Sequence, residues 1–283
     1  MIAIDRQRCS GCGFCVRICH EHCIELQGGI PVFRTAVCSM CTQCVAACPT
    51  QALTWDAAPP RRKDTSLLPS TAQLDELFLE RRSVRFFKRQ GIDRALLAEI
   101  VDRAVYAPKE NFRLRAIVVD DRALIEAMDR AMLRVARRVY NLLYRSGRLT
   151  VLRALARLVG KEHVLMRHAP KLEAAVRRGT AWPTLPAAVV LIVGLKGIPL
   201  SRDSAQFALA NLMYAAQVRG LGCCLCGNGP LFLDKNKSIR AALAVQQGED
   251  ILGALVLGHP AVRFANVLSG RAMPLQWNGG TTT

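Results

Sequence analysis

The spacing of apolar residues predicts helices and strands in alternation over most of the chain beyond residue 70. Apolar residues recur at helical intervals in three segments, 71–81, 93–106 and 203–219. Ser70 with Thr71, and Asp93, are candidate N-caps of the first two helices, and Gly220 follows the third as a stop signal. Short runs rich in β-branched residues predict strands at 115–120, 187–193 and 251–257. This mixture predicts an α+β fold.

The apolar runs are too short to span a membrane. The strongest candidate, 185–195, falls well below the roughly 18 residues that a bilayer requires, and it predicts a buried strand. No apolar stretch follows Met1 ahead of a cleavage site, so we expect no export signal and a cytoplasmic location. The 283 residues, 51% of them apolar, suffice for one or two domains with buried cores.

The cysteines add a second kind of pattern. Nine of the twelve lie between Cys9 and Cys48, and disulfides rarely persist in a reducing cytoplasm, so this cluster indicates metal binding or catalysis. The spacing Cys-x2-Cys-x2-Cys-x3-Cys occurs twice, and the second copy is displaced by 29 residues and followed by Pro49. The repeat therefore predicts a metal-binding half-domain that has been duplicated once.

Thiolates are the soft ligands that iron–sulfur clusters require, and in runs of this spacing the fourth cysteine ligates the other cluster. We therefore expect two [4Fe–4S] clusters. The expected ligands are Cys9, Cys12, Cys15 and Cys48 for the first cluster, and Cys38, Cys41, Cys44 and Cys19 for the second. Zinc is the alternative because four-cysteine zinc sites also use Cys-x2-Cys pairs, but the two complete runs with Pro49 favour clusters. Residues 1–56 resemble a bacterial two-cluster ferredoxin.

Two residues of this region fall outside the pattern. His20 stands where the first run would carry proline; we interpret it as a tolerated surface substitution, the alternative being a hydrogen bond to a cluster sulfur. Cys23 belongs to neither run, and we interpret it as a small packed thiol. Residues 57–71 are rich in proline and charge and predict a linker.

The remaining domain, 72–283, carries several motifs in a fixed order. They are Arg-Arg-Ser-Val-Arg at 81–85, Asn111 after Ala-Pro, a glycine- and cysteine-rich segment at 220–227, Leu-Gly-His-Pro at 257–260 and Arg-Ala-Met-Pro at 271–274. In this order they resemble the nitroreductase family of FMN enzymes, over about residues 72–120 and 184–277. The whole chain therefore resembles a ferredoxin–nitroreductase fusion.

This resemblance implies a homodimer with FMN at the subunit interface. The cofactor-binding residues that it implies are Arg81, Arg82, Ser83, Arg85, Asn111, Cys226, Gly227 and Arg271. An arginine fork suits the FMN phosphate, which we assign to Arg81, and a cation beside the ring stabilises reduced flavin, which we assign to Arg85. Gly220, Gly222 and Gly227 would permit a close backbone approach to the ring.

Three cysteines lie beside that approach, Cys223, Cys224 and Cys226. We expect them to be core or pocket-lining thiols, with a redox partner of the flavin as the alternative. Adjacent residues of an extended segment point to opposite faces, which disfavours a third metal site.

The implied function is an oxidoreductase in which electrons pass from an external donor through both clusters to FMN and on to an electron-poor acceptor, such as a nitroaromatic or a quinone. Lys109, Glu110, Arg113 and Leu114 depart from the family pattern beside Asn111, which leaves dehalogenation or ene reduction as an alternative. A non-catalytic electron carrier or redox sensor is the third hypothesis. No Gly-x-Gly-x-x-Gly motif indicates a nicotinamide domain, and no side chain stands out as a proton donor.

Charge is concentrated in the segment 122–181, which has helical spacing and no strand signal. Between 122 and 178 there are 14 Lys or Arg against 4 Asp or Glu, a net +10 of the chain's +17. We expect a basic helical insertion that caps the flavin site. Docking of an acidic redox donor and association with a membrane surface are the alternatives. We do not expect nucleic-acid binding, because no recognition motif accompanies the arginines.

Overall fold

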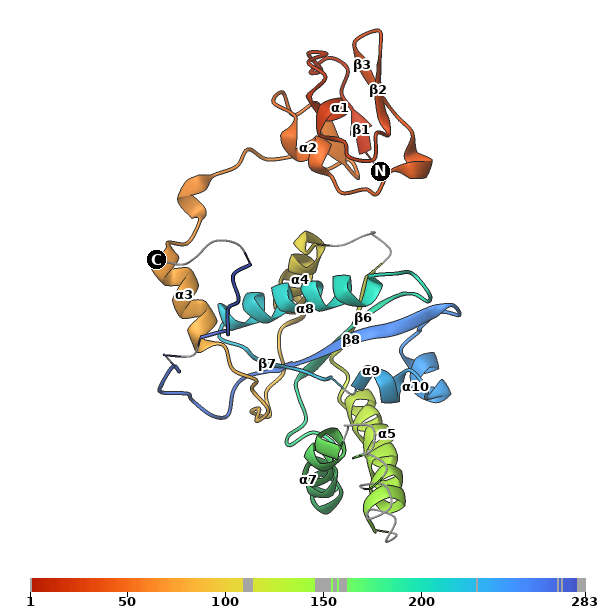
Figure 1. Cartoon of the computed structure of the whole chain (residues 1–283), viewed down its shortest axis with the longest axis vertical. Coiled ribbons are helices and arrows are strands. Elements are labelled where there is room, and N and C mark those ends of the chain that lie inside the picture. Colours follow the sequence, from red (N-terminus) through yellow and green to blue (C-terminus); the bar gives the residue numbers. More distant parts are fainter. Residues whose placement is uncertain are drawn as a thin grey trace.

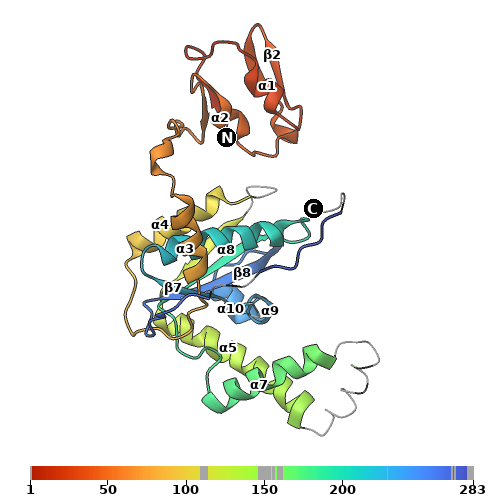
Figure 2. The same ribbon diagram turned by 60° about the vertical axis from the view of Figure 1, so that its left-hand side comes forward.

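The computed structural model describes residues 2–108, 114–145, 154, 157, 162–227, 229–268, 270 and 272–278. Figures 1 and 2 show a small N-terminal module that stands apart from a larger domain and is joined to it by one connecting segment. Over the described residues, no helix has both the length and the apolar character needed to cross a membrane.

The N-terminal module is built from two small antiparallel sheets and two short helices. Strand β1 (Ile2–Ile4) pairs with β4 (Leu53–Trp55), and β2 (Ile24–Gln27) pairs with β3 (Ile30–Phe33). Helices α1 (Phe14–Ile18) and α2 (Gln43–Ala47) pack against each other, and the 3-10 turn η1 (Thr35–Val37) precedes α2. So small a core depends on the many cysteines that are packed into it.

The backbone repeats with the same displacement of 29 residues as the cysteines. Helix α2 lies 29 positions after α1 at both ends. Left-handed backbone conformations recur at this interval in four pairs, Gly11 with Met40, Gly13 with Thr42, His22 with Gln51, and Gly28 with Ala57. The duplication expected from sequence is therefore present in the conformation of the chain.

The connecting segment leads into a well-capped helix. It contains the 3-10 turn η2 (Thr65–Leu67), and α3 (Thr71–Glu80) follows. The Ser70 hydroxyl accepts the Gln73 N–H, and the Gln73 side chain accepts the Ser70 N–H, so the predicted N-cap is part of a capping box. Phe78 packs edge-on against Tyr214 at 5.3 Å, which fixes α3 to the larger domain.

The larger domain is organised around one antiparallel sheet in the order β5-β6-β8-β7. Its strands are β5 (Arg115–Val119), β6 (Ala188–Leu195), β7 (Gly222–Leu225) and β8 (Glu249–Gly258). Strand β6 is central and buried on both faces, which accounts for its continuous apolar sequence. Val189, Leu191 and Val193 face one core, and the alternate residues face the other.

Helices cover both faces of this sheet. On one side lie α4 (Arg94–Asp102), η3 (Arg103–Tyr106) and α8 (Ser201–Gln217); on the other lie α5 (Arg122–Tyr140), α9 (Gly229–Leu233) and α10 (Lys237–Ala242). Asp93 caps α4 as predicted, by accepting the Leu96 N–H. Gly220 has φ +72° after the last turn of α8, as a C-terminal stop requires.

The basic segment forms a helical projection. Helix α5 continues into a π-helical turn, η4 (Asn141–Arg145), and α7 (Glu162–Arg178) packs against α5. Figures 1 and 2 show both helices at the end of the domain opposite to the N-terminal module. The described residues of this segment are therefore mostly helical.

Candidate functional site

Four cysteines surround a cavity in the first half of the N-terminal module. They are Cys9, Cys12, Cys15 and Cys48, the set expected for the first cluster. Three come from the first run, and the fourth comes from the end of α2 in the second copy. The last cysteine of the second run therefore lines the cavity formed by the first run.

A second cavity repeats this arrangement with the roles of the two copies exchanged. It is lined by Cys38, Cys41 and Cys44 of the second run and by Cys19 of the first. Each cavity thus combines three cysteines of one run with the last cysteine of the other, the ligand pattern of a two-cluster ferredoxin.

Hydrogen bonds favour the ligand form of two of these cysteines. The backbone N–H of Phe14 and the Ser10 hydroxyl lower the pKa of Cys12. Burial acts to raise the pKa of Cys48, but hydrogen bonds from Thr50 and from nearby backbone N–H groups outweigh it, so the pKa is lowered.

Two other thiols of these cavities are deeper in the module. Burial raises the pKa of Cys15, and it raises the pKa of Cys44 to about 11. Coordination to a positively charged metal group would oppose this effect and favour their thiolate forms.

The two residues outside the cysteine pattern have different surroundings. His20 is exposed, with Nε2 3.2 Å from the Glu21 carboxylate, in keeping with a surface substitution. Cys23 is 1% exposed, as expected for a packed thiol, but it also lines the second cavity, with Sγ 3.4 Å from that of Cys19. Burial, and then its contact with Cys19, raise the pKa of Cys23 to about 12.

In the larger domain, the arginine-rich segment after α3 lies directly beside β7. Ser83 forms a parallel bridge with Cys223, and the Val84 N–H donates to the Cys223 carbonyl at 2.9 Å. The fold therefore brings 81–85 next to 223–227, two of the segments that the resemblance assigns to cofactor binding. Asn111 and Arg271 lie outside the described residues.

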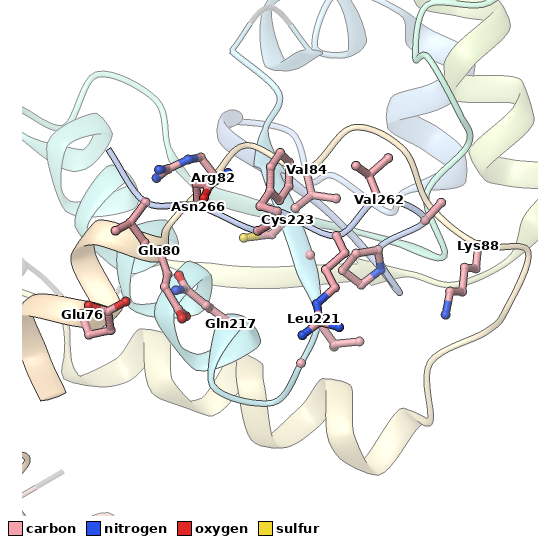
Figure 3. A pocket seen from close by; sticks show the side chains of 18 residues that line it. Glu76, Glu80, Arg82, Val84, Lys88, Gln217, Leu221, Cys223, Val262 and Asn266 are labelled. Carbon is pink, nitrogen blue, oxygen red and sulfur yellow. The ribbon is translucent and has the colours of Figure 1, made fainter. Parts of the chain in front are cut away.

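A cavity of about 830 Å³ opens beside this junction. One wall is formed by α3 and the segment after it, another by Gly222 and Cys223, and a third by the chain at 260–267. Figure 3 shows Glu76 and Glu80 on one side of it and Lys88 on the other. The C-terminal wall and these charged residues follow no sequence pattern, and sequence reasoning missed them.

Arg82 is the motif arginine that lines the cavity. Its Nη1 donates to the carbonyls of Leu79 and Arg81 at 2.6 and 2.9 Å, so the side chain closes the C-terminus of α3. Its Nη2 is buried without a hydrogen-bond partner in the described part of the chain. A guanidinium among the residues that line the cavity fits an anionic ligand group.

Arg85, unlike Arg82, has an exposed side chain, and its segment is held by Thr184. Arg85 is exposed, and its guanidinium donates to the Ser83 carbonyl at 3.2 Å. Thr184, which sequence reasoning also missed, fastens this segment: its hydroxyl donates to the Arg85 carbonyl and accepts the Phe87 N–H. The motif is thus tied to a residue almost a hundred positions away.

The three cysteines of this region lie on opposite faces, as the sequence predicts. Cys223 packs in the core beneath α8, whereas Cys224 and Cys226 pack against the core beneath α5. Burial raises the pKa of Cys223 to about 11, with the charge of Arg81 acting in the other direction. Burial also raises the pKa of Cys226. This placement fits core and pocket-lining thiols.

Two glycines beside these cysteines differ in what they approach. A Cβ on Gly222 would lie 2.7 Å from the Val84 side chain, so glycine here permits a close approach to the motif segment, and ring contact at Gly222 stays a prediction. A Cβ on Gly227 would meet nothing within 4 Å, which leaves open space at its backbone.

Comparison with known proteins identifies both parts. Residues 79–259 match the model of the nitroreductase family. The chain belongs to this family. Residues 8–52 match the model of 4Fe-4S dicluster domains. An uncharacterized ferredoxin of Methanocaldococcus jannaschii is 30% identical over 67 residues, which are 22% of this chain and 87% of that protein. A ferredoxin-type 4Fe-4S domain thus precedes the nitroreductase domain, as the sequence predicts.

Solved structures agree with this assignment at the level of the fold. An FMN-bound nitroreductase from Desulfitobacterium hafniense DCB-2 aligns with a TM-score of 0.53 and 16% identity over 71% of this chain and 97% of its own. Iodotyrosine deiodinase bound to FMN and 3-iodo-L-tyrosine gives 0.51 and 19% identity, over 73% and 99%. A BluB-like flavoprotein from Clostridium difficile 630 gives 0.50 and 18%, over 71% and 94%. The predicted α+β fold is confirmed.

The basic insertion of this nitroreductase domain is joined to the rest through a buried carboxylate. Asp129 of α5 is 4% exposed and accepts the N–H groups of Ala181 and Trp182, each at 2.9 Å. Burial raises the pKa of Asp129, while these hydrogen bonds act in the other direction. Trp182 packs in the same core as Cys226, so α5 supports the strand end beside the motif.

Proposed function

We propose that this chain is an iron–sulfur flavoprotein oxidoreductase that transfers electrons from an external donor to an electron-poor small molecule, such as a nitroaromatic or a quinone. In this proposal two [4Fe–4S] clusters relay single electrons and FMN passes them to the acceptor. The observation that carries it is the attachment of two crossed four-cysteine cavities to a nitroreductase domain whose arginine motif is paired with β7.

The cysteine cavities support the cluster part of the proposal. Each is lined by four cysteines of the two runs, the number that a [4Fe–4S] cluster takes, and the second is also lined by Cys23. Backbone N–H groups also point at ligand sulfurs, from Met40 to Cys38 at 3.4 Å and from Ala52 to Cys48 at 3.3 Å. Such hydrogen bonds stabilise thiolates that carry the negative charge of a reduced cluster.

The arginine motif supports the flavin part. We assign the FMN phosphate to Arg81 and Arg82, because Arg82 lines the cavity, its neighbour Arg81 belongs to the same motif, and guanidinium forks bind phosphate bidentately. Ser83 and Arg85, on the same segment, would hold the ring edge, and the open backbone at Gly227 would face the ring. Cys226 and Gly227 line a separate cavity with Arg202 and Gln206, and we assign them to the site by resemblance, as we do Asn111 and Arg271.

Exposed apolar residues support a homodimer. Helix α8 exposes Phe207, and the extended C-terminal segment exposes Phe264, Met273, Leu275 and Trp277 by 51–81%. Large apolar side chains gathered on extended or helical surfaces indicate contact with another protein surface. We therefore propose that two copies pair through these segments.

The twelve cysteines form no disulfide bonds, which suits the reducing cytoplasm where we expect the protein to act.

The position of the insertion bears on where the donor docks. Within one chain, α5 and α7 lie at the opposite end from the N-terminal module (Figures 1 and 2). A donor bound to the exposed Arg134, Arg137 and Arg138 would therefore be far from the clusters of that chain. This favours a cap that supports the flavin strand over a docking surface for an acidic donor.

The decisive experiment is anaerobic purification of the full chain followed by iron, sulfide and flavin analysis and a reoxidation assay. We expect about eight irons and one FMN per chain, and faster reoxidation by nitro or quinone acceptors than by buffer. A panel of halogenated and alkene acceptors tests the other flavin reactions. Cofactor content without acceptor-dependent reoxidation would establish a carrier, and a colourless preparation would refute the proposal.

A further inference from the structure

The two crossing cysteines are equivalent in the repeat but have different hydrogen-bond donors. Cys48 receives the Ala52 N–H at 3.3 Å, and its sulfur lies 3.6 Å from the Thr50 hydroxyl. Cys19 instead has the Cys23 sulfur at 3.4 Å. The difference lies in residues that the cysteine pattern leaves out.

Cys23 and Ala52 are themselves a repeat pair, 29 positions apart. Both are 1% exposed, and both carbonyls accept a backbone N–H at 2.8 Å, from Arg34 and from Asp5 respectively. The two donors are again 29 positions apart. The backbone surroundings are therefore alike, and the first copy carries the thiol of Cys23 where the second copy carries the methyl group of Ala52.

The direction of the Cys19–Cys23 hydrogen bond follows from metal binding. A cysteine that ligates a cluster has lost its proton, so Cys19 can only accept and the Cys23 S–H must donate. Cys23 lines the same cavity as Cys38, Cys41 and Cys44, beside the sulfurs to which the cluster would be bound. Reduction adds negative charge to the cluster and its ligands, so a donor at this position stabilises the reduced form more than the oxidised one.

We propose that Cys23 is a positioning residue that donates its S–H to Cys19 and raises the reduction potential of the cluster held by Cys19, Cys38, Cys41 and Cys44. This inference rests on the cluster assignment proposed above. It also makes the two clusters inequivalent through a side chain that is no ligand.

The test compares three variants of the full chain by anaerobic redox titration, with the clusters followed by electron paramagnetic resonance. Cys23→Ala removes the donor, and we expect one midpoint to fall by an amount equal to about a fivefold change in the reduced-to-oxidised ratio, about 40 mV for one electron. Cys23→Ser restores a donor and should bring this midpoint back towards the wild-type value. Ala52→Cys places a thiol at the equivalent position beside Cys48 and should raise the other midpoint.

Several results would overturn the inference. They are an unchanged midpoint in Cys23→Ala with full iron content, equal shifts of both midpoints, or no rescue by Cys23→Ser. If Cys23→Ala loses iron, Ala52→Cys decides, because an unmoved midpoint there contradicts the role of the thiol. Iron and sulfide analysis of the wild type comes first, so failure of the cluster assignment is distinguished from failure of this inference.

Discussion

The N–H of Val84 donates to the carbonyl of Cys223 at 2.9 Å, and this hydrogen bond joins the arginine motif to the cysteine-rich strand. Val84 also fills the space that a side chain at Gly222 would need. Backbone pairing and side-chain packing therefore both hold residues 81–85 against β7.

Gly222→Ala should disrupt the junction, because its Cβ would lie 2.7–2.9 Å from three Val84 side-chain carbons in the core. We expect a loss of about 1–3 kcal/mol in the free energy of unfolding, as for other overpacked sites, together with weaker flavin retention. Gly227→Ala is the matched variant, since its Cβ would meet no atom within 4 Å. It should weaken flavin binding at nearly unchanged stability in urea denaturation. Equal stability losses in the two variants would contradict this account.

Arg81→Ala should weaken FMN retention about tenfold, the value of one charge-assisted hydrogen bond to a phosphate. Iron content should not change, because the cysteine cavities lie in a separate module. Flavin stoichiometry after dialysis measures the effect. Arg89→Ala, an exposed arginine of the following loop, is the control and should retain flavin like the wild type. Unaltered retention in Arg81→Ala would show that the motif assignment is wrong.

Cys48→Ser should remove the cluster of Cys9, Cys12 and Cys15 before the other one, because the fourth sulfur crosses between the copies. Cys19→Ser should have the converse effect. About half of the iron should remain in each variant, with a single cluster signal in electron paramagnetic resonance. Loss of iron from both sites to the same extent would argue against crossed ligation.

The ion pair between Arg115 and Glu249 should make stability depend on pH. Arg115 donates to both carboxylate oxygens of Glu249, whose side chain is 9% exposed, and these hydrogen bonds lower the pKa of Glu249. A carboxylate whose pKa is lowered by folding stabilises the protein above its unfolded pKa, about 4.3 for Glu, and the contribution is lost as pH falls through the folded value.

Glu249→Gln should therefore cost about 2 kcal/mol at pH 7, less than a fully buried pair because the Arg115 side chain is 37% exposed. The difference from wild type should shrink below about pH 4, as Glu249 itself becomes protonated. Urea denaturation across this range measures it. Asp120→Asn at the exposed Arg94 pair is the control and should have a smaller effect. A loss of unfolding free energy that does not vary with pH would show that the ionised Glu249 carboxylate is not its cause.

Features encoded by neighbouring residues could be predicted from the sequence. Ser70 and Asp93 cap their helices through side-chain contacts three residues away. The apolar run of β6 reflects burial on both faces. The cysteine repeat identified the residues that line both cavities, because ligand spacing follows from the size of the group that is bound.

Features that depend on distant contacts could not be predicted. Nothing local marks Thr184 as the residue that fastens the motif, since its contact with Phe87 spans 97 positions. The chain at 260–267 forms a cavity wall without regular structure or periodicity. The contact of Gly222 with Val84 also depends on residues 138 positions apart, because a glycine in the sequence shows that space is needed but not which side chain fills it.

The crossing of Cys19 and Cys48 between the copies has a consequence for how the N-terminal module assembles. A chain cut between the repeats would leave each fragment with three sulfurs for its own cavity and one for its neighbour's. Under the cluster assignment proposed above, neither fragment would carry the full ligand set of either group, so complete ligation of either group requires both copies of the repeat in one folded module.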